Sequence, residues 1–197
     1  TNRLTMDTSE IPGDLILTPC TVCDGNGNIY LSCLVYGEYV YIYDTRSDET
    51  ARQIVSLPTA SNSNTFLAKY NKNGIVQWYT FVSGVSGTPS ISVDNRYVRG
   101  IDNSSVYISG TYNNSNIYLY DGVREGSPNN SKYLSGFNTF DMFVAKYKKD
   151  GELEWVTKAG GSESDLNSSI VATNDGHIYV AGEFNHSEFY VYQGYTL

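Results

Sequence analysis

The residues whose types could support chemistry are few, and the cysteines come first. Cys20 and Cys23 have the spacing of half a zinc knuckle, but a closed zinc site needs four ligands and only Cys33 lies nearby. An odd number of cysteines confined to one segment is not a disulfide framework. We therefore predict no metal site and interpret Cys20, Cys23 and Cys33 as ordinary buried thiols, with metal binding as the alternative.

Oxygen donors stand at alternate positions in Asp24-Gly-Asn-Gly-Asn28, as they do in calcium-binding loops. Such loops carry glycine at the sixth position and an acidic residue at the twelfth. Ile29 and Val35 occupy these two positions here. We therefore interpret the segment as a turn between strands.

The groups suited to acid–base catalysis are His177, His186, Glu183 and Glu188. Nucleophilic and acid–base catalysis require such groups to converge on one point. Neither histidine has an evident partner in the sequence, and the two glutamates flank an expected strand bend. We predict no catalytic residues, no cofactor and no enzymatic activity.

Internal repetition is the strongest signal in the chain. The segment Phe66–Trp78 returns without a gap as Phe143–Trp155, at an offset of 77 residues (143 − 66). A second element starts at residues 29, 106 and 178, at offsets of 77 (106 − 29) and 72 (178 − 106). Its tyrosines align in three columns: Tyr30, Tyr107 and Tyr179; Tyr41, Tyr118 and Tyr190; Tyr43, Tyr120 and Tyr192.

Each full copy predicts four antiparallel strands. In the middle copy they are expected at 66–70, 75–82, 97–101 and 106–112, with turns rich in Asn, Asp and Gly between them. The second strand of the last copy alternates in polarity. We expect one face to carry Leu153, Trp155, Thr157 and Ala159, and the other Glu152, Glu154 and Lys158.

These motifs resemble a β-propeller repeat family found in bacterial extracellular proteins and large viruses. Its unit reads Phe-Val-Ala-Lys, a glycine turn, a strand with Trp, a Gly-rich stretch and Val-Tyr-Val-x-Gly. The matching residues are Phe143–Lys146, Gly151, Trp155, Gly160-Gly161 and Tyr179–Gly182, while the middle copy has Ser83-Gly84 for the double glycine. The resemblance implies an all-β fold, a β-propeller of which this chain holds about two and a half four-stranded blades.

The implied organisation divides the chain into six segments. They are a lead-in at 1–14, the second half of a blade at 15–44, a connection at 45–64, a complete blade at 65–122, a connection at 123–138 and a complete blade at 139–197. The connections are long for structureless loops, so we expect short outer strands at 52–57 and 132–135. Because propellers close into rings, a longer polypeptide or an assembly of several chains would complete the ring, and we favour the former.

Composition supports the all-β prediction and excludes some partners. The chain has 18 Tyr, 18 Gly and 14% aromatic residues, which favours strands and turns and excludes general disorder. A net charge of −8 with scattered basic residues argues against a nucleic-acid surface. No apolar run reaches the roughly 18 residues that a membrane-spanning helix requires.

Five Asn-x-Ser sequons are candidate N-glycosylation sites. They lie at Asn103, Asn113, Asn129, Asn167 and Asn185. Asn113 and Asn185 occupy the same repeat position (185 − 113 = 72), so glycans are expected there first. The alternative is that these are simply Asn-rich loops.

The sequence thus predicts a non-enzymatic structural scaffold that binds other proteins. It would be a propeller segment of a larger secreted, cell-surface or virion-surface protein. The alternative is a lectin-like module that binds glycans, because tyrosine offers a rigid apolar face with a polar tip. The recurrence of the tyrosine columns favours packing between blades over a unique binding pocket.

Overall fold

The structure is a computed structural model that describes most of the chain. The described residues are 15–37, 39–43, 53–56, 63–98, 101–113, 116–125, 128, 131–136, 139–185, 188, 190–192 and 195–196. Every regular element in these ranges is a β-strand, and every pairing between strands is antiparallel. The all-β prediction is confirmed.

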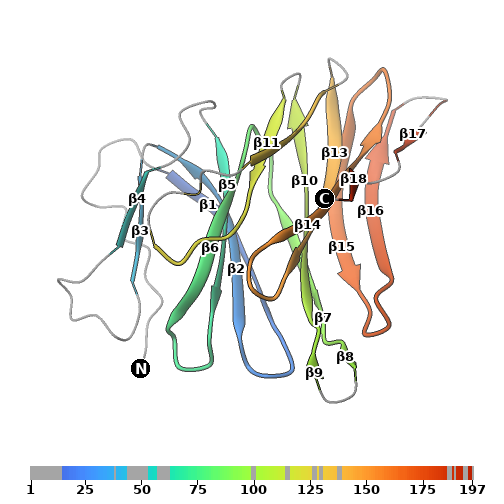
Figure 1. Cartoon of the computed structure of the whole chain (residues 1–197). Helices are drawn as coiled ribbons and strands as arrows, with labels where there is room; N and C mark the ends of the chain where they lie inside the picture. The colour runs from blue at the N-terminus through green and yellow to red at the C-terminus, as the bar shows by residue number, and fades with distance from the viewer. Residues whose placement is uncertain are drawn as a thin grey trace.

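Two four-stranded meanders and one hairpin make up the body of the structure (Figure 1). Sheet 1 consists of β1 (Leu15–Cys23), β2 (Ile29–Tyr36), β5 (Asn64–Tyr70) and β6 (Val76–Ser83). Sheet 2 consists of β7 (Ser90–Asp94), β10 (Ser105–Asn113), β13 (Phe140–Lys148) and β14 (Leu153–Gly160). Sheet 3 consists of β15 (Asp165–Ala172) and β16 (Ile178–Phe184).

Short strands lie outside these three sheets or extend their edges. They are β3 (Tyr39–Ile42), β4 (Gln53–Ser56), β8 (Tyr97–Val98), β9 (Ile101–Asp102), β11 (Ile117–Tyr120), β12 (Ser131–Leu134), β17 (Tyr190–Val191) and β18 (Tyr195–Thr196). The strands β11 and β17 occupy the same repeat position, and each pairs with the last strand of the preceding meander, β6 and β14. The predicted outer strands at 52–57 and 132–135 are present as β4 and β12, with residues 52 and 57 outside the described ranges.

The meanders are out of phase with the units read from the sequence. In sheet 2, β10 pairs with β13 along its whole length, from Ser105 opposite Lys148 to Asn113 opposite Phe140. The strands β2 and β5 pair in the same way. Each meander therefore takes two strands from one copy and two from the next, so the segments 65–122 and 139–197 each contribute to two sheets. The strands β2 and β10 are buried along nearly their whole length, so the backbone groups on both of their edges need a hydrogen-bonded neighbour. The first strand of the next copy supplies the second neighbour.

Two local predictions need correction. The third strand of the middle copy was expected at 97–101, but the strand that joins the meander is β7, because Ile91 and Val93 alternate into the core. Residues 97–98 and 101–102 form the separate antiparallel pair β8–β9 instead.

The expected alternation of β14 is interrupted by a β-bulge. Lys146 pairs with Trp155 and Tyr147 pairs with Leu153, so Glu154 is the extra residue of the bulge. Leu153 and Trp155 consequently belong to different hydrophobic clusters, on opposite faces of sheet 2. Lys158, expected on the face that carries Glu152 and Glu154, is buried, and its Nζ donates to the Ser135 carbonyl at 2.7 Å.

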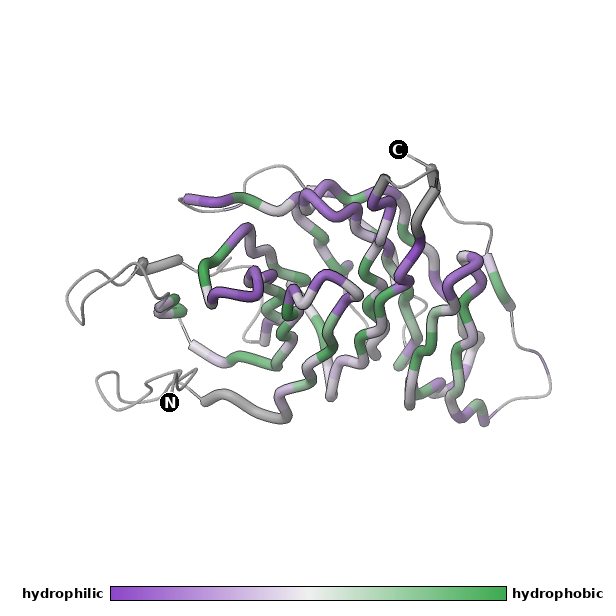
Figure 2. The backbone as a smooth tube through the Cα atoms, turned by 90° about the horizontal axis from the view of Figure 1, so that it is seen from below, coloured by the Kyte–Doolittle hydropathy of each residue, from purple (hydrophilic) through white to green (hydrophobic). Residues whose placement is uncertain are grey.

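The main core lies between sheets 1 and 2, with a smaller one between sheets 2 and 3. Strands β1, β7 and β15 of successive sheets contact one another, so the sheets pack face to face in chain order. Apolar stretches follow the strands in the backbone view of Figure 2. The largest cluster joins side chains such as Leu67 and Val82 of sheet 1 to Val106, Ile108 and Phe143 of sheet 2.

Disulfide trapping tests the phase of the meanders. Ser109 and Val144 lie opposite each other on β10 and β13. We expect the double variant Ser109→Cys/Val144→Cys to form a disulfide between positions 109 and 144 on mild oxidation, because the Cα atoms of directly opposed residues lie within the distance that a disulfide can span. Peptide mapping distinguishes it from linkages to the natural cysteines. If each repeat unit of the sequence formed one sheet, β6 would pair with β7. The double variant Val82→Cys/Ile91→Cys would then form a disulfide readily, and this result would contradict the observed phase.

Candidate functional site

A tryptophan fixes the joint between sheets 1 and 2. Trp78 is 2% exposed, stacks on Tyr147 at 6.3 Å between ring centroids, and meets the edge of Tyr30 at 6.1 Å. Its Nε1 donates to the Lys149 carbonyl at 2.9 Å. The turn between β13 and β14 thus caps a tryptophan that belongs to the preceding meander.

Close packing at this joint requires a glycine in the capping turn. Gly151 has φ +97°, and a Cβ there would lie 2.9 Å from Cδ2 of Trp78. Its carbonyl accepts a hydrogen bond from the Gly122 N–H at 2.8 Å. The Leu153 N–H donates to Asp121 Oδ1 at 2.8 Å. Trp78 therefore packs between sheets 1 and 2 against a turn that belongs to the following copy.

A buried lysine completes the joint, and no role was predicted for it from the sequence. Lys69 is 6% exposed, its Nζ donates to the Lys149 carbonyl at 2.9 Å, and it lies 5.2 Å from the Tyr30 ring centroid. Burial lowers the pKa of Lys69, while the charges of Asp24 and Asp102 oppose that shift. A lysine of lowered pKa suits Schiff-base chemistry, but this ammonium is engaged in packing. The sequence signal that could have marked Lys69 is the recurrence of a lysine at the same repeat position, Lys146.

The second copy of the joint is less complete. Lys146 lies 5.9 Å from the Tyr107 ring centroid and its Nζ is 3.0 Å from Glu154 Oε1. The Tyr107 and Trp155 rings are 6.1 Å apart, and the Tyr107 hydroxyl donates to Asp94 Oδ2 at 2.9 Å. Trp155 is only partly buried, unlike Trp78.

The segment weighed as a calcium loop is a hydrogen-bonded turn. Asp24 Oδ1 accepts from the backbone N–H groups of Asn26 and Asn28 at 2.9 Å, and Oδ2 accepts from Asn28 Nδ2 at 2.7 Å. The turn also reaches the next sheet, because the Gly25 N–H donates to Asn95 Oδ1 at 2.6 Å. Among the described residues, no group of three or more His, Cys, Asp or Glu side chains could hold a metal ion.

The acid–base candidates do not converge. His177 Nδ1 is 3.0 Å from Asp175 Oδ2, with both side chains about two-thirds exposed or more. Hydrogen bonds from Thr173 and His177 lower the pKa of Asp175 to about 2. Glu183 is exposed, and Glu188 accepts from the Tyr190 hydroxyl at 2.6 Å. His186 lies outside the described residues.

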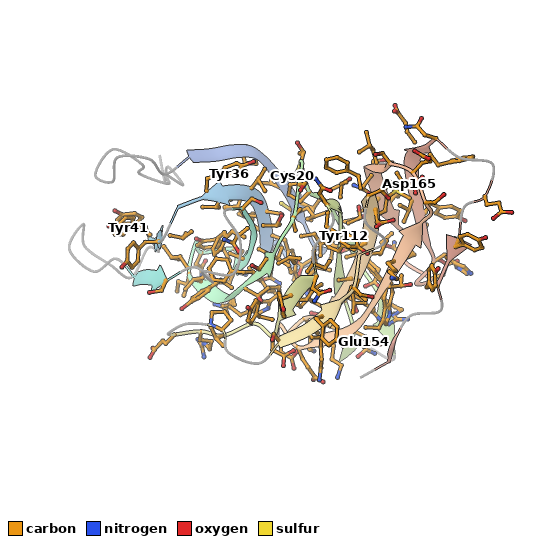
Figure 3. All side chains as sticks on the ribbon, turned by 90° about the horizontal axis from the view of Figure 1, so that it is seen from above. Cys20, Tyr36, Tyr41, Tyr112, Glu154 and Asp165 are labelled. Atoms are coloured by element: carbon orange, nitrogen blue, oxygen red, sulfur yellow. The ribbon has the colours of Figure 1, made fainter. Side chains whose placement is uncertain are left out.

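The three cysteines differ in environment. Cys33 is buried. This burial, and to a smaller extent the nearby Cys20, raises the pKa of the Cys33 thiol to about 12. Cys20 lies between sheets 1 and 2 (Figure 3), where its Sγ donates to the Pro89 carbonyl at 3.2 Å. Cys23 is exposed, so the prediction of buried thiols is wrong for this residue. No disulfide joins the three.

The sequons lie in different settings. Asn103 and Asn185 are exposed, Asn113 is partly exposed at the end of β10, and Asn129 lies outside the described residues. Both amide atoms of the Asn167 side chain are buried. Attachment of a glycan needs an accessible Nδ2, so the geometry argues against Asn167.

The tyrosine columns separate into packed and outer positions. Tyr30 and Tyr107 are buried, whereas Tyr179 at the same repeat position is 66% exposed. Tyr41, on β3, lies at the outer side of sheet 1 and far from the interior Tyr112 (Figure 3). The outer strands are held by a repeated bond, since the hydroxyls of Thr80 and Thr157 donate to the carbonyls of residues 120 and 192.

Comparison with known proteins gives one informative relative. No family model and no solved structure matches the chain. The chain is 24% identical to an uncharacterized WD repeat-containing protein of Acanthamoeba polyphaga mimivirus, over 195 aligned positions that cover 82% of this chain. The match spans 14% of that relative's length. It supports a β-propeller repeat family in coarse terms.

The part of the chain that the structure describes contains no helix with the length and apolar character needed to cross a membrane.

The buried tyrosines predict loss of stability at alkaline pH. Burial raises the pKa of Tyr79 to about 12 and the pKa values of Tyr30, Tyr107, Tyr112 and Tyr147 still further. Because these folded pKa values exceed the unfolded value near 10, their contribution to stability is complete below pH ~10 and is lost as pH rises further. The pKa of Lys69 is lowered, so its contribution to stability rises with pH, but only up to the ordinary lysine pKa of 10.5.

We therefore expect the urea midpoint to fall steeply above pH ~10. Tyrosinate absorbance should rise in two stages: the exposed rings first, and the buried rings together with unfolding. A single titration of all tyrosines near pH ~10 with the fold intact would contradict the burial described above.

Proposed function

We propose that this chain is a run of propeller blades within a non-enzymatic scaffold that works through contacts with other proteins. The observation that carries the proposal is the repeated architecture. Two meanders and a hairpin pack face to face in chain order, and β1, β7 and β15 contact one another in succession. Successive four-stranded sheets around a common axis are the arrangement of a β-propeller.

The relative supports this proposal. It is named as a WD repeat-containing protein, and WD repeats form four-stranded propeller blades. Repeats of this kind usually expose their binding surfaces on loops and outer edges, because the inner strands are consumed in packing.

The non-enzymatic part of the proposal is supported by how the polar groups are used. In the part of the chain that the structure describes, Lys69 and Asp24 serve packing and turn formation, while His177 and Asp175 form an exposed pair. Function lives in sites rather than in folds, and the groups placed here favour no reaction class.

We further propose a secreted, cell-surface or virion-surface location. The net charge of −8 and the polar, Asn-rich turns suit an exposed surface. The viral origin of the relative supports the virion option.

The outer hairpin β11–β12 is our candidate contact surface. Tyr133 is 65% exposed and lies 6.4 Å from the Tyr118 ring, and Lys132 beside it is exposed. A cleft of about 500 Å³ adjoins it, lined by residues 131–135, Val156 and Lys158. Tyrosine is enriched at protein interfaces because it buries a large area at low entropic cost.

Cross-linking of native material tests the scaffold. We expect lysine-reactive reagents to join Lys132 to another protein, and Tyr133→Ala to reduce that product about tenfold, as for a moderate hot spot. Lys72→Ala, in an exposed turn of sheet 1, is the matched control and should leave the product unchanged. If Lys132 cross-links only within its own polypeptide, the proposed contact surface is wrong.

A glycan-binding module is the second candidate, and the tyrosines beside this cleft are the observation that favours it. Binding on a glycan array that Tyr133→Ala abolishes would establish it in place of the protein scaffold.

A further inference from the structure

The outer edge of β16 differs from its two counterparts. The strands β2, β10 and β16 share the Tyr-containing repeat element, and β2 and β10 are almost completely buried. The β16 side chains are exposed from Tyr179 to Phe184. Within the described residues, β16 pairs only with β15, whereas β2 and β10 each pair with a second strand.

The second strand on β2 and on β10 has the same sequence pattern. In sheet 1 it is β5, with Phe66 opposite Cys33 and Lys69 opposite Tyr30. In sheet 2 it is β13, with Phe143 opposite Gly110 and Lys146 opposite Tyr107. One register thus serves both sheets, and it places a lysine opposite the first tyrosine column.

The residues of β16 fit the same register. Tyr179 and Gly182 occupy the repeat positions of Tyr107 and Gly110 (179 − 107 = 72; 182 − 110 = 72). A Cβ at Gly110 would lie 2.7 Å from Cε1 of Phe143, so the phenylalanine ring of β13 lies against this glycine. At Gly182 a Cβ would lie 2.7 Å from Sδ of Met142. An incoming phenylalanine ring would therefore take the place of this flexible methionine side chain.

A cleft beside β16 provides the space. It has a volume of about 460 Å³ and lies between β13–β14 and β16. Its walls are mainly apolar and include Met142, Val144, Ala159, Val180, Gly182 and Phe184. Val144 is the repeat counterpart of Leu67; Leu67 is completely buried in the cluster between sheets 1 and 2, and Val144 is 7% exposed.

Trp155, on the neighbouring strand β14, is less covered than its counterpart in sheet 1. Its counterpart Trp78 is covered by Tyr147 and by the carbonyl of Lys149, both from the hairpin of the next meander. Trp155 has no equivalent hairpin among the described residues and stays partly exposed.

We propose that the β16 edge and this cleft bind a β-hairpin of the same repeat, with the pattern Phe-x-Ala-Lys-Tyr, a glycine turn and a Trp. The hairpin pairs antiparallel to β16, with its lysine opposite Tyr179 and its phenylalanine opposite Gly182. Its tyrosine and turn carbonyl cover Trp155. The proposal deepens the scaffold function by naming the chemistry of one partner segment, and it depends on strand register rather than on ring closure.

Register-specific disulfide trapping tests the proposal. The probe is a peptide of residues 139–161, the chain's own β13–β14 hairpin, with Val144→Cys. The receptor is the full chain with Ala181→Cys, because Ser109 at that repeat position lies opposite Val144. Cys20→Ser and Cys23→Ser remove the two more accessible natural thiols. We expect one peptide to be captured per chain, through residue 181.

Two controls define the register. A peptide with Lys146→Cys in place of Val144→Cys is displaced by two residues and should be captured at least tenfold less. Tyr179→Ala in the receptor should also reduce capture several-fold, whereas Tyr133→Ala, equally exposed but on β12, should not. Equal capture of both peptides would overturn the proposed register.

A covalent extension covers the case in which the free peptide is too weakly structured. Appending a second copy of residues 126–161 after Leu197 continues the 72-residue offset of the last repeat and raises the local hairpin concentration. We expect the copied Val144→Cys to trap Ala181→Cys and the fluorescence of Trp155 to shift to the blue.

Failure of the extension to trap would overturn the hairpin site. So would dimers of the unextended chain joined through β16, since the edge would then serve a second copy. Either result would leave the Lys132 cross-links, and hence the scaffold proposal, untouched.

Discussion

The fold depends on one constraint: the central strand of each meander is buried on both faces and must be paired on both edges. In β2 and β10 nearly every side chain is enclosed, so an unpaired backbone edge there would leave polar groups away from water. One edge is paired by the preceding strand of the same copy. The other can be paired only by the first strand of the next copy, which is why the sheets straddle the repeats.

This sharing of strands links neighbouring parts of the chain through several kinds of contact, from the inner strands to the outer edge. The inner strands touch, the Trp78 ring is capped by a turn of sheet 2, and β11 extends sheet 1 from beyond β10. The contact of β1 with β7 and the hydrogen bond from Trp78 to Lys149 cross a repeat boundary, so no single copy completes its own core. The strands β6 and β11 both belong to the copy 65–122. Such coupling gives a stack that folds as a unit and stabilises neighbouring repeats mutually, which suits a scaffold whose outer hairpins are left for partners.

Much of this could be predicted from the sequence, but not all of it. The repeat located the buried strands and the outer hairpins because tyrosine, lysine and tryptophan recur at fixed offsets. The phase of the sheets could not be inferred, since adjacent strands in sequence suggest local hairpins and β10–β13 pairing spans a long connection. The bulge at Glu154 also escaped prediction, because an extra residue in one strand shows only in its pairing. Lys69 was part of the motif, yet its burial depends on Lys149 of the next copy.

Native-state hydrogen exchange on the chain tests the central constraint most directly. The strands β10 and β16 share their repeat position, so local sequence alone predicts similar exchange. We expect the amides of residues 106–112 to be protected at least a hundredfold more than those of 178–184 in the monomer, because, among the described residues, β10 is paired on both edges and β16 on one. Equal protection of the two strands in a monomeric chain would contradict it.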